Sequence, residues 1–212
     1  MSTEAKVSEG ARKLKLVAVT KNRSVSEVLQ MLQSTEIGFI AENRVTEAAE
    51  KFPKLPLYLE KHFIGKLQSR KIPQIVELFD VIQSVENLKQ AKKISAECVK
   101  QNKNMQVFLQ VNITSQENRS GTTPEEVPHL IPQIAALPNL QLAGVMGMAS
   151  PLAETTEETV ASQFQLLKFL QNGLQECSMG MSDDWQIAMA EGSTMVRLGR
   201  MLFEDNLDSI DQ

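Results

Sequence analysis

Lys21 is the residue whose position best suits covalent chemistry. It follows the apolar run Leu16-Val-Ala-Val-Thr20, which has the composition of a buried strand. An amine at the end of such a strand is expected to be partly sheltered from water, which favours imine formation with a carbonyl compound. A surface lysine whose stem covers apolar residues is the alternative, and Lys21 alone does not decide between the two.

Two segments near the C-terminus have the composition of a phosphate site. Ser178-Met-Gly-Met-Ser182 leads into a predicted helix, and the glycine-bounded segment 192–199 follows it closely. Parallel barrels often bind phosphate in the loops after strands seven and eight, beside a helix N-terminus. Ser182 would supply a hydroxyl, and Gly199 would let the backbone approach closely. The alternative is that the two aspartates after Ser182 only cap the helix.

Arg197 lies at the end of the last predicted strand. A guanidinium is costly to bury there unless it is paired, so its partner is either a ligand nitrogen or a barrel glutamate. Together, a strand-end lysine, a phosphate site and a strand-end arginine meet three needs of pyridoxal 5'-phosphate: an imine partner, a phosphate anchor and a partner for the pyridine nitrogen. We therefore expect this cofactor to be the ligand.

The elements that must position these residues alternate along the whole chain. The predicted strands are Leu16–Thr20, Ile37–Ala41, Tyr58–Gly65, Asp80–Gln83, Gln106–Ile113, Leu140–Met148, a short one within Cys177–Ser182, and Thr194–Leu198. The predicted helices are Val25–Gln33, Val45–Lys51, one at Pro73, one from about Val85 to Cys98, one near Pro124, one that includes Val160 to Leu174, and one opened by Asp183 and Asp184.

Eight such alternations predict an α/β fold, a single (β/α)₈ barrel compressed around its seventh strand. The chain has 212 residues, near the lower size of about 200 for such barrels. An open, doubly wound sheet is the structural alternative. No linker or change in composition divides the chain, so we expect one domain over residues 1–212 with a core of about 15–204.

Composition narrows the function classes. The sequence has 22 Lys+Arg against 26 Asp+Glu, for a net charge of −4, and no basic block of the kind that binds nucleic acid. The two cysteines, Cys98 and Cys177, indicate reduced thiols. The polar N-terminus has no apolar signal region, and the longest apolar run, 142–149, is far shorter than the ~20 residues that span a bilayer. We expect a cytoplasmic protein that binds neither nucleic acid nor membrane.

Several blocks, taken in order, resemble those of the pyridoxal phosphate homeostasis protein family, from about Leu16 to Phe203. They are Val17-Ala-Val-Thr-Lys21, Ala41-Glu-Asn43, His62-Phe-Ile-Gly-Lys-Leu-Gln-Ser69, Gln110-Val-Asn-Ile113, Ser178-Met-Gly-Met-Ser-Asp-Asp184 and Gly192-Ser-Thr-Met-Val-Arg-Leu-Gly199. The resemblance implies the fold of the N-terminal domain of alanine racemase. The sequence departs from the family pattern at Ala41, Arg70 and Arg119, and in a short N-terminal segment.

The resemblance also implies roles for single residues, all of them cofactor-binding. It implies that Lys21 forms the internal aldimine and that Arg197 faces the pyridine nitrogen. It further implies a place near the cofactor for Asn43, and phosphate contacts for Ser182, Gly199 and the backbone of Arg200. We interpret His62 as a hydrogen-bonded barrel residue and not as a proton donor, and we expect no metal.

Binding of the cofactor leaves three functions open: a carrier, an amino-acid racemase, or another pyridoxal enzyme such as a decarboxylase. A racemase needs acid–base groups on both faces of the substrate, and the second one in alanine racemase is a tyrosine from another domain. The only tyrosine here, Tyr58, lies near the start of the third predicted strand. An arginine against the ring nitrogen also disfavours its protonation. We expect a monomeric vitamin B6 carrier that supplies apo-enzymes, with a weak racemase as the alternative.

Overall fold

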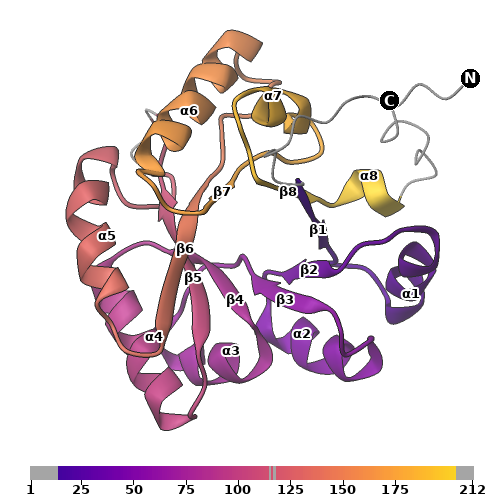
Figure 1. Cartoon of the computed structure of the whole chain (residues 1–212). Helices are drawn as coiled ribbons and strands as arrows, with labels where there is room; N and C mark the ends of the chain where they lie inside the picture. Colours follow the sequence, from indigo (N-terminus) through magenta and orange to yellow (C-terminus); the bar gives the residue numbers. More distant parts are fainter. Residues whose placement is uncertain (1–13, 115, 117, 204–212) are drawn as a thin grey trace, which may run out of the picture.

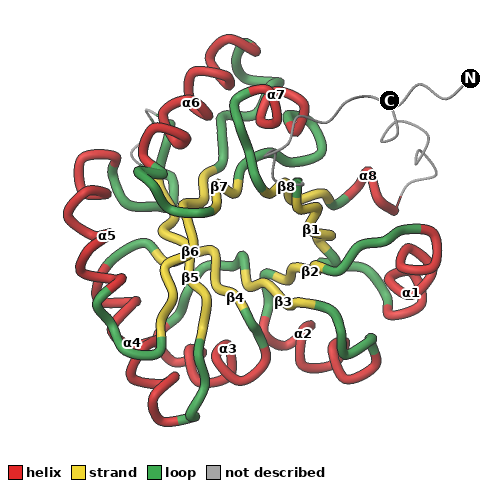
Figure 2. The backbone as a smooth tube through the Cα atoms, in the orientation of Figure 1, coloured by secondary structure: helices red, strands yellow, loops and turns green. Residues whose placement is uncertain are grey.

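A closed parallel barrel forms the centre of the molecule. The structure is a computed structural model that describes residues 14–114, 116 and 118–203. Its eight strands pair in chain order, and β8 pairs back with β1, so the sheet has no edge. Helices surround the strands (Figure 1, Figure 2). The predicted (β/α)₈ barrel is confirmed, and the open-sheet alternative is wrong.

The strands are β1 (Lys15–Val19), β2 (Phe39–Glu42), β3 (Glu60–Phe63), β4 (Val81–Val85), β5 (Met105–Val111), β6 (Leu140–Gly147), β7 (Glu176–Ser178) and β8 (Met195–Leu198). The α-helices are α1 (Val25–Ser34), α2 (Val45–Lys51), α3 (Ile72–Leu78), α4 (Leu88–Lys100), α5 (Val127–Ala135), α6 (Glu157–Leu170), α7 (Trp185–Ala190) and α8 (Arg200–Phe203). Short 3₁₀ turns cover Phe52–Lys54, Ser69–Lys71 and Pro124–Glu126.

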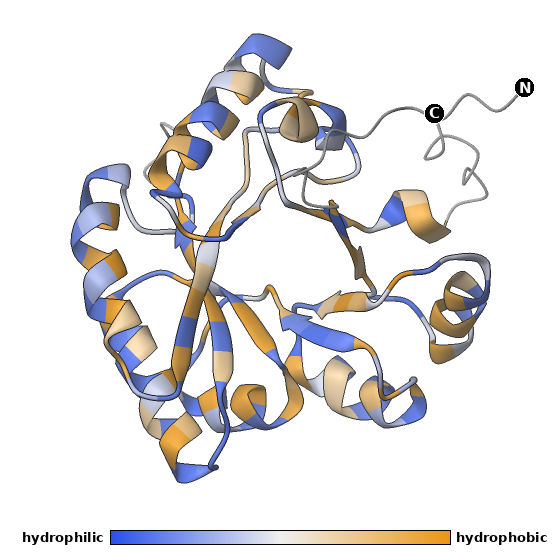
Figure 3. Ribbon diagram, in the orientation of Figure 1, coloured by the Kyte–Doolittle hydropathy of each residue, from blue (hydrophilic) through white to orange (hydrophobic). Residues whose placement is uncertain are grey.

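Two apolar layers follow from the alternation of side chains along the strands. One cluster fills the inside of the barrel and is contributed by strand residues such as Val17, Ala41 and Phe108. The larger cluster lies between the strands and the helices, where residues such as Ile94 and Phe164 are fully buried. Most helices in Figure 3 carry both apolar and polar segments, as elements with one buried face should.

The compressed seventh strand still closes the barrel. β7 has three residues and pairs with β6 through Gly144↔Glu176 and its two successors, and with β8 through Ser178↔Met195. A Cβ added at Gly144 would overlap the Glu176 carbonyl, so glycine is required where β7 lies against β6. Three residues in register are therefore enough to join β6 to β8.

Two predicted helix boundaries are wrong. The helix expected from about Val85 begins at Leu88, because Val85 ends β4 and the Asn87 side chain caps the helix by accepting from Gln90 N at 3.0 Å. Leu174 lies beyond the end of α6. Left-handed backbone at Asn172 and Gly173, with φ of 44° and 80°, ends that helix before Leu174.

The structure bears on the expectation about membranes but not on the one about the chain ends. The short N-terminal segment and residue 204 lie outside the described residues. Within the described part of the chain, no helix combines the length and the apolar character needed to cross a bilayer.

Cys98 and Cys177 are both free and buried, and burial raises their pKa values to about 11 and about 12, which keeps them as thiols.

Candidate functional site

The predicted site residues gather at the carboxyl ends of the strands. β1 pairs with β2 through Val19↔Ala41, so Lys21 and Asn43 each lie two residues beyond paired positions on neighbouring strands. β1 also pairs with β8 through Ala18↔Leu198, which places Gly199 beside Val19. This rim is the end of a parallel barrel at which ligands bind.

Lys21 is exposed, so the expected shelter for its amine is wrong. The strand ends at Val19, and Lys21 lies in the turn that follows, outside the apolar layers. Among the described residues, no hydrogen bond or ion pair engages its amine. The backbone around it is fixed, because Thr20 N donates to Ala41 O at 3.0 Å and Asn22 N donates to Glu47 Oε2 at 3.1 Å. A free amine on a fixed loop is available to a ligand.

A buried ion pair that the sequence did not single out supports this loop. The Glu42 side chain is fully buried, and Lys51 Nζ contacts its Oε1. Lys51 Nζ also donates to Thr20 O at 2.6 Å, the carbonyl that directly precedes Lys21, and Thr20 Oγ1 donates to Glu42 Oε1 at 2.6 Å. Lys51, from α2, therefore ties the helix layer to the end of β1.

Arg197 is buried, with 4% of its surface exposed, and has no carboxylate partner within the described residues. Its Nη1 donates to Ser178 Oγ at 2.6 Å, and its Nη2 donates to Gly147 O at 3.1 Å. Burial lowers the pKa of Arg197 to about 10, so the guanidinium stays charged at neutral pH. Among the described residues no glutamate pairs with Arg197, the alternative to a ligand partner. Its hydrogen bonds go to neutral oxygens, and the charge of the Asp184 carboxylate favours its protonated form.

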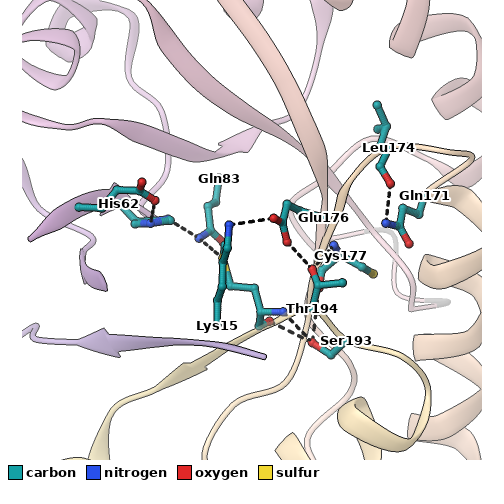
Figure 4. Close-up of polar contacts among 11 residues, drawn as sticks. Lys15, His62, Gln83, Gln171, Leu174, Glu176, Cys177, Ser193 and Thr194 are labelled. Carbon is teal, nitrogen blue, oxygen red and sulfur yellow. Dashed lines mark hydrogen bonds and ion pairs between the residues drawn. The ribbon is translucent and has the colours of Figure 1, made fainter. Parts of the chain in front are cut away.

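A line of hydrogen bonds runs from Arg197 across the barrel. Ser178 Oγ donates to Gln83 Oε1 at 2.7 Å, and Gln83 Nε2 lies 2.8 Å from His62 Nδ1. His62 Nε2 lies 2.9 Å from Glu60 Oε1, and this hydrogen bond lowers the pKa of Glu60. Both ring nitrogens of the buried His62 are thus satisfied, which confirms that it is a hydrogen-bonded barrel residue. Figure 4 shows the contact between His62 and Gln83.

The loops after β7 and β8 meet where phosphate was predicted. Gly199 N donates to Ser182 Oγ at 3.4 Å. A Cβ built on Gly199 would make only ordinary contacts, 3.7 Å from Val19 Cβ, so none of the residues that the structure describes requires glycine there. Both the contact and the space suit an approaching ligand oxygen.

The two aspartates of this loop do not cap α7 through their side chains. Asp184 is at the N-cap position, but its Oδ1 accepts from Met181 N at 2.6 Å, and burial raises its pKa. Asp183 pairs with the Arg200 side chain, with 2.8 Å between Oδ2 and Nη2. This ion pair is exposed on both sides and therefore weak, and the predicted phosphate contact concerns only the Arg200 backbone. The Asn43 side chain is half-buried and forms no hydrogen bond with any described residue.

The opposite end of the barrel is closed by a separate polar group. Lys15 Nζ donates to Glu176 Oε1 at 2.8 Å, and Thr194 Oγ1 donates to Glu176 Oε2 at 2.6 Å (Figure 4). Lys15 and Glu176 are the first residues of β1 and β7. Tyr58 precedes β3 at this same end and is 69% exposed. It therefore lies away from the rim that holds Lys21.

Comparison with known proteins places the chain among relatives of one kind. The family described as "Alanine racemase, N-terminal domain" matches residues 4–206. The pyridoxal phosphate homeostasis protein of Synechocystis is 38% identical over 204 residues, 92% of each chain. That of Pasteurella multocida is 36% identical over 210 residues, 94% of this chain and 89% of the relative.

Solved structures of other proteins share the fold of this chain. PipY of Synechococcus elongatus, solved without PLP, is 32% identical with a TM-score of 0.83, covering 90% of this chain and 92% of PipY. The same protein with PLP bound has a TM-score of 0.80. Alanine racemase of Clostridium difficile, 18% identical with a TM-score of 0.77 over 52% of its chain, shares the fold. The chain therefore belongs to the alanine racemase N-terminal domain family and, within it, to the pyridoxal phosphate homeostasis proteins.

Proposed function

We propose that this chain binds pyridoxal 5'-phosphate and serves intracellular vitamin B6 homeostasis by holding the cofactor and releasing it to other proteins. The observation that carries the proposal is that two cationic groups lie toward one rim: the Lys21 amine, which forms no hydrogen bond or ion pair with a described residue, and the buried Arg197 guanidinium, whose hydrogen bonds go only to neutral oxygens. The printed names of the relatives, and PipY with PLP bound, support it.

The residues present fit this cofactor. The bound group would supply an aldehyde on a pyridine ring that also bears a phosphate. The Lys21 amine would hold the cofactor reversibly at its aldehyde, the group with which a lysine amine condenses. Ser182 Oγ and the backbone at Gly199 and Arg200 bind the phosphate, and Asn43 lies beside the ring. The Arg197 guanidinium donates to the ring nitrogen.

A carrier suits these residues better than a racemase does. Arg197 stays protonated near neutral pH, so it keeps the facing ring nitrogen unprotonated and weakens the ring as an electron sink. Tyr58 lies at the opposite end of the barrel and cannot supply the second acid–base group. The shared fold keeps a weak amino-acid racemase as the alternative function.

Paired assays test the carrier against the racemase. We expect negligible interconversion of L- and D-alanine or serine at high protein concentration, together with reactivation of an apo-transaminase by the loaded protein. An acid–base group typically contributes ~10²–10⁴-fold to a rate, so its loss should leave racemisation far below enzymatic rates. A turnover of about 1–10³ s⁻¹ with any amino acid would contradict the proposal.

The phosphate contact gives a second prediction. Ser182→Ala should weaken pyridoxal 5'-phosphate binding by ~1.5–3 kcal/mol, the value of one hydrogen bond to a charged group, and should change the affinity for unphosphorylated pyridoxal little. Titration calorimetry with both compounds measures the two affinities. Ser162→Ala is the matched control, because this exposed serine lies on α6 and its hydroxyl donates to Glu158 O of the same helix. Equal losses for both ligands would place the phosphate elsewhere.

The proposal also covers the compartment, the oligomeric state and the recipients of the cofactor. We infer a single cytoplasmic barrel domain that acts as a monomer and has apo pyridoxal enzymes as recipients. The free, buried cysteines are compatible with a reducing compartment. Sedimentation at micromolar concentration tests the monomer directly.

A further inference from the structure

The line of hydrogen bonds behind Arg197 has only one side chain in direct contact with the guanidinium. Of the two oxygens that Arg197 bonds, one is the backbone carbonyl of Gly147, and the other is Ser178 Oγ. A backbone carbonyl inside a strand cannot reorient. The direction of the buried guanidinium therefore depends on where the Ser178 hydroxyl is held.

The proton positions along the line follow from what each group can do. Arginine only donates, so Ser178 Oγ accepts from Arg197 and uses its own hydrogen toward Gln83 Oε1, 2.7 Å away. This fixes the Gln83 amide, whose Nε2 then donates to His62 Nδ1 at 2.8 Å. His62 accepts at Nδ1, so it carries its hydrogen on Nε2 and donates to Glu60 Oε1 at 2.9 Å.

Each member of this line is locked by its neighbours. Gln83 and His62 are fully buried, and Ser178 is fully buried beside them. Glu60, at the first position of β3, is the member whose side chain reaches solvent, with 36% exposed. The line therefore extends from the amino end of β3 to the rim near the carboxyl ends of β7 and β8.

We propose that Gln83 and His62 are positioning residues for the ring-nitrogen side of the site, acting on Arg197 through Ser178. The inference rests on the proposed function, since it takes the pyridine nitrogen as the partner of Arg197. Gln83 supplies the one acceptor for the Ser178 hydroxyl, and His62 holds the Gln83 amide in the orientation that presents this acceptor. Gln83 bonds Ser178 and Met195 Sδ, but among the described residues neither Gln83 nor His62 forms a hydrogen bond with Ser182, Gly199 or the Lys21 turn.

This role has a signature that a purely structural role lacks. Disturbing Gln83 should weaken the contact to the ring nitrogen and leave the aldehyde and phosphate contacts in place. The affinity for pyridoxal 5'-phosphate should then fall, while the affinity for a carbocyclic analogue, in which CH replaces the ring nitrogen, should not. The ratio of the two affinities isolates the ring nitrogen from general damage to the barrel.

The experiment measures both dissociation constants by fluorescence titration for the full chain, for three variants of the line and for one control variant. Gln83→Met removes the amide contacts to Ser178, His62 and Met195 Sδ, and Ser178→Ala removes the direct contact to Arg197. We expect each to reduce the preference for pyridoxal 5'-phosphate over the analogue about tenfold, the worth of one charge-assisted hydrogen bond. Gln83→Glu keeps an acceptor for Ser178 and should retain most of the preference.

Ser95→Ala is the matched control, because it removes a buried hydroxyl of α4 that donates to Pro138 O at 2.6 Å, in the helix layer and away from this line. It should lower the melting temperature without changing the ratio. Equal weakening of both ligands in folded Gln83→Met, or an unchanged ratio, would overturn the inference. If Gln83→Met does not fold, the ratio of the two affinities in Ser178→Ala tests the inference by the same criteria. Wild-type protein that binds both compounds equally would refute the inference alone, whereas wild-type protein that binds neither would refute the proposed function.

Discussion

Replacing Lys51 by methionine should lower the free energy of unfolding by about 3–5 kcal/mol, the usual cost of leaving one partner of a buried ion pair alone. The Glu42 side chain is fully buried, and its Oε2 already has no partner among the described residues. Without Lys51 the carboxylate keeps only the Thr20 hydroxyl. Urea unfolding followed by circular dichroism measures the change.

The double variant Glu42→Gln with Lys51→Met is the control for this prediction. It removes both charges and should recover most of the lost stability, because no uncompensated charge stays buried. A loss below about 1 kcal/mol in the single variant would show that the pair is hydrated and weak. The single variant should also weaken cofactor binding, since Lys51 holds the Thr20 carbonyl next to Lys21.

Replacing Lys21 by alanine should abolish the visible absorption band of the loaded protein, because alanine cannot condense with an aldehyde. Lys21 is exposed and its amine forms no hydrogen bond or ion pair with a described residue, so the free energy of unfolding should stay within ~0.5 kcal/mol of the wild type. The loss would then be chemical and not a consequence of unfolding. Absorption spectra and urea unfolding of the same samples separate the two effects.

Two further lysine variants sharpen this result. Lys21→Arg keeps the positive charge but forms no imine, so it should lack the band as well. Lys66→Ala removes another exposed lysine, in the segment after β3, and should keep the band at full intensity. A Lys21→Ala protein that retains the full band would show that another lysine holds the cofactor.

The sequence predicted the fold because the barrel follows from local patterns. Each strand and helix has its own apolar periodicity, and the order of elements sets the order of strands in a parallel barrel. The compressed segment before Ser178 was the weakest part of the prediction. Three residues at β7 proved sufficient, since Gly144 on β6 lets the short strand lie close.

The surroundings of the site residues could not be read from the sequence. Lys21 was expected to be sheltered and is exposed, because β1 ends before it. The sequence left a ligand nitrogen or a barrel glutamate as the partner of Arg197, and the structure shows Ser178 Oγ as its side-chain partner. Ser178 and Gln83 are 95 residues apart and meet only because the barrel closes, so no local pattern indicates their contact. The roles of Asn43, Ser182, Gly199 and Arg200 toward the cofactor stay predictions.

The pair formed by Glu42 and Lys51 was missed for a similar reason. The two residues are nine positions apart, on the end of β2 and in the last turn of α2. A charged residue at a strand end is usually solvated, and only the packing of α2 on the barrel buries both side chains. A search for opposite charges at the end of a strand and the end of the following helix would have found this pair.

Borohydride reduction of the loaded protein, followed by mass spectrometry of its peptides, tests the central claim most directly. Reduction converts the C=N bond into a stable amine and marks the lysine that held the cofactor. We predict one equivalent of label, confined to the peptide that contains Lys21. Label on another lysine would contradict the account. So would a loaded protein that carries no label after reduction.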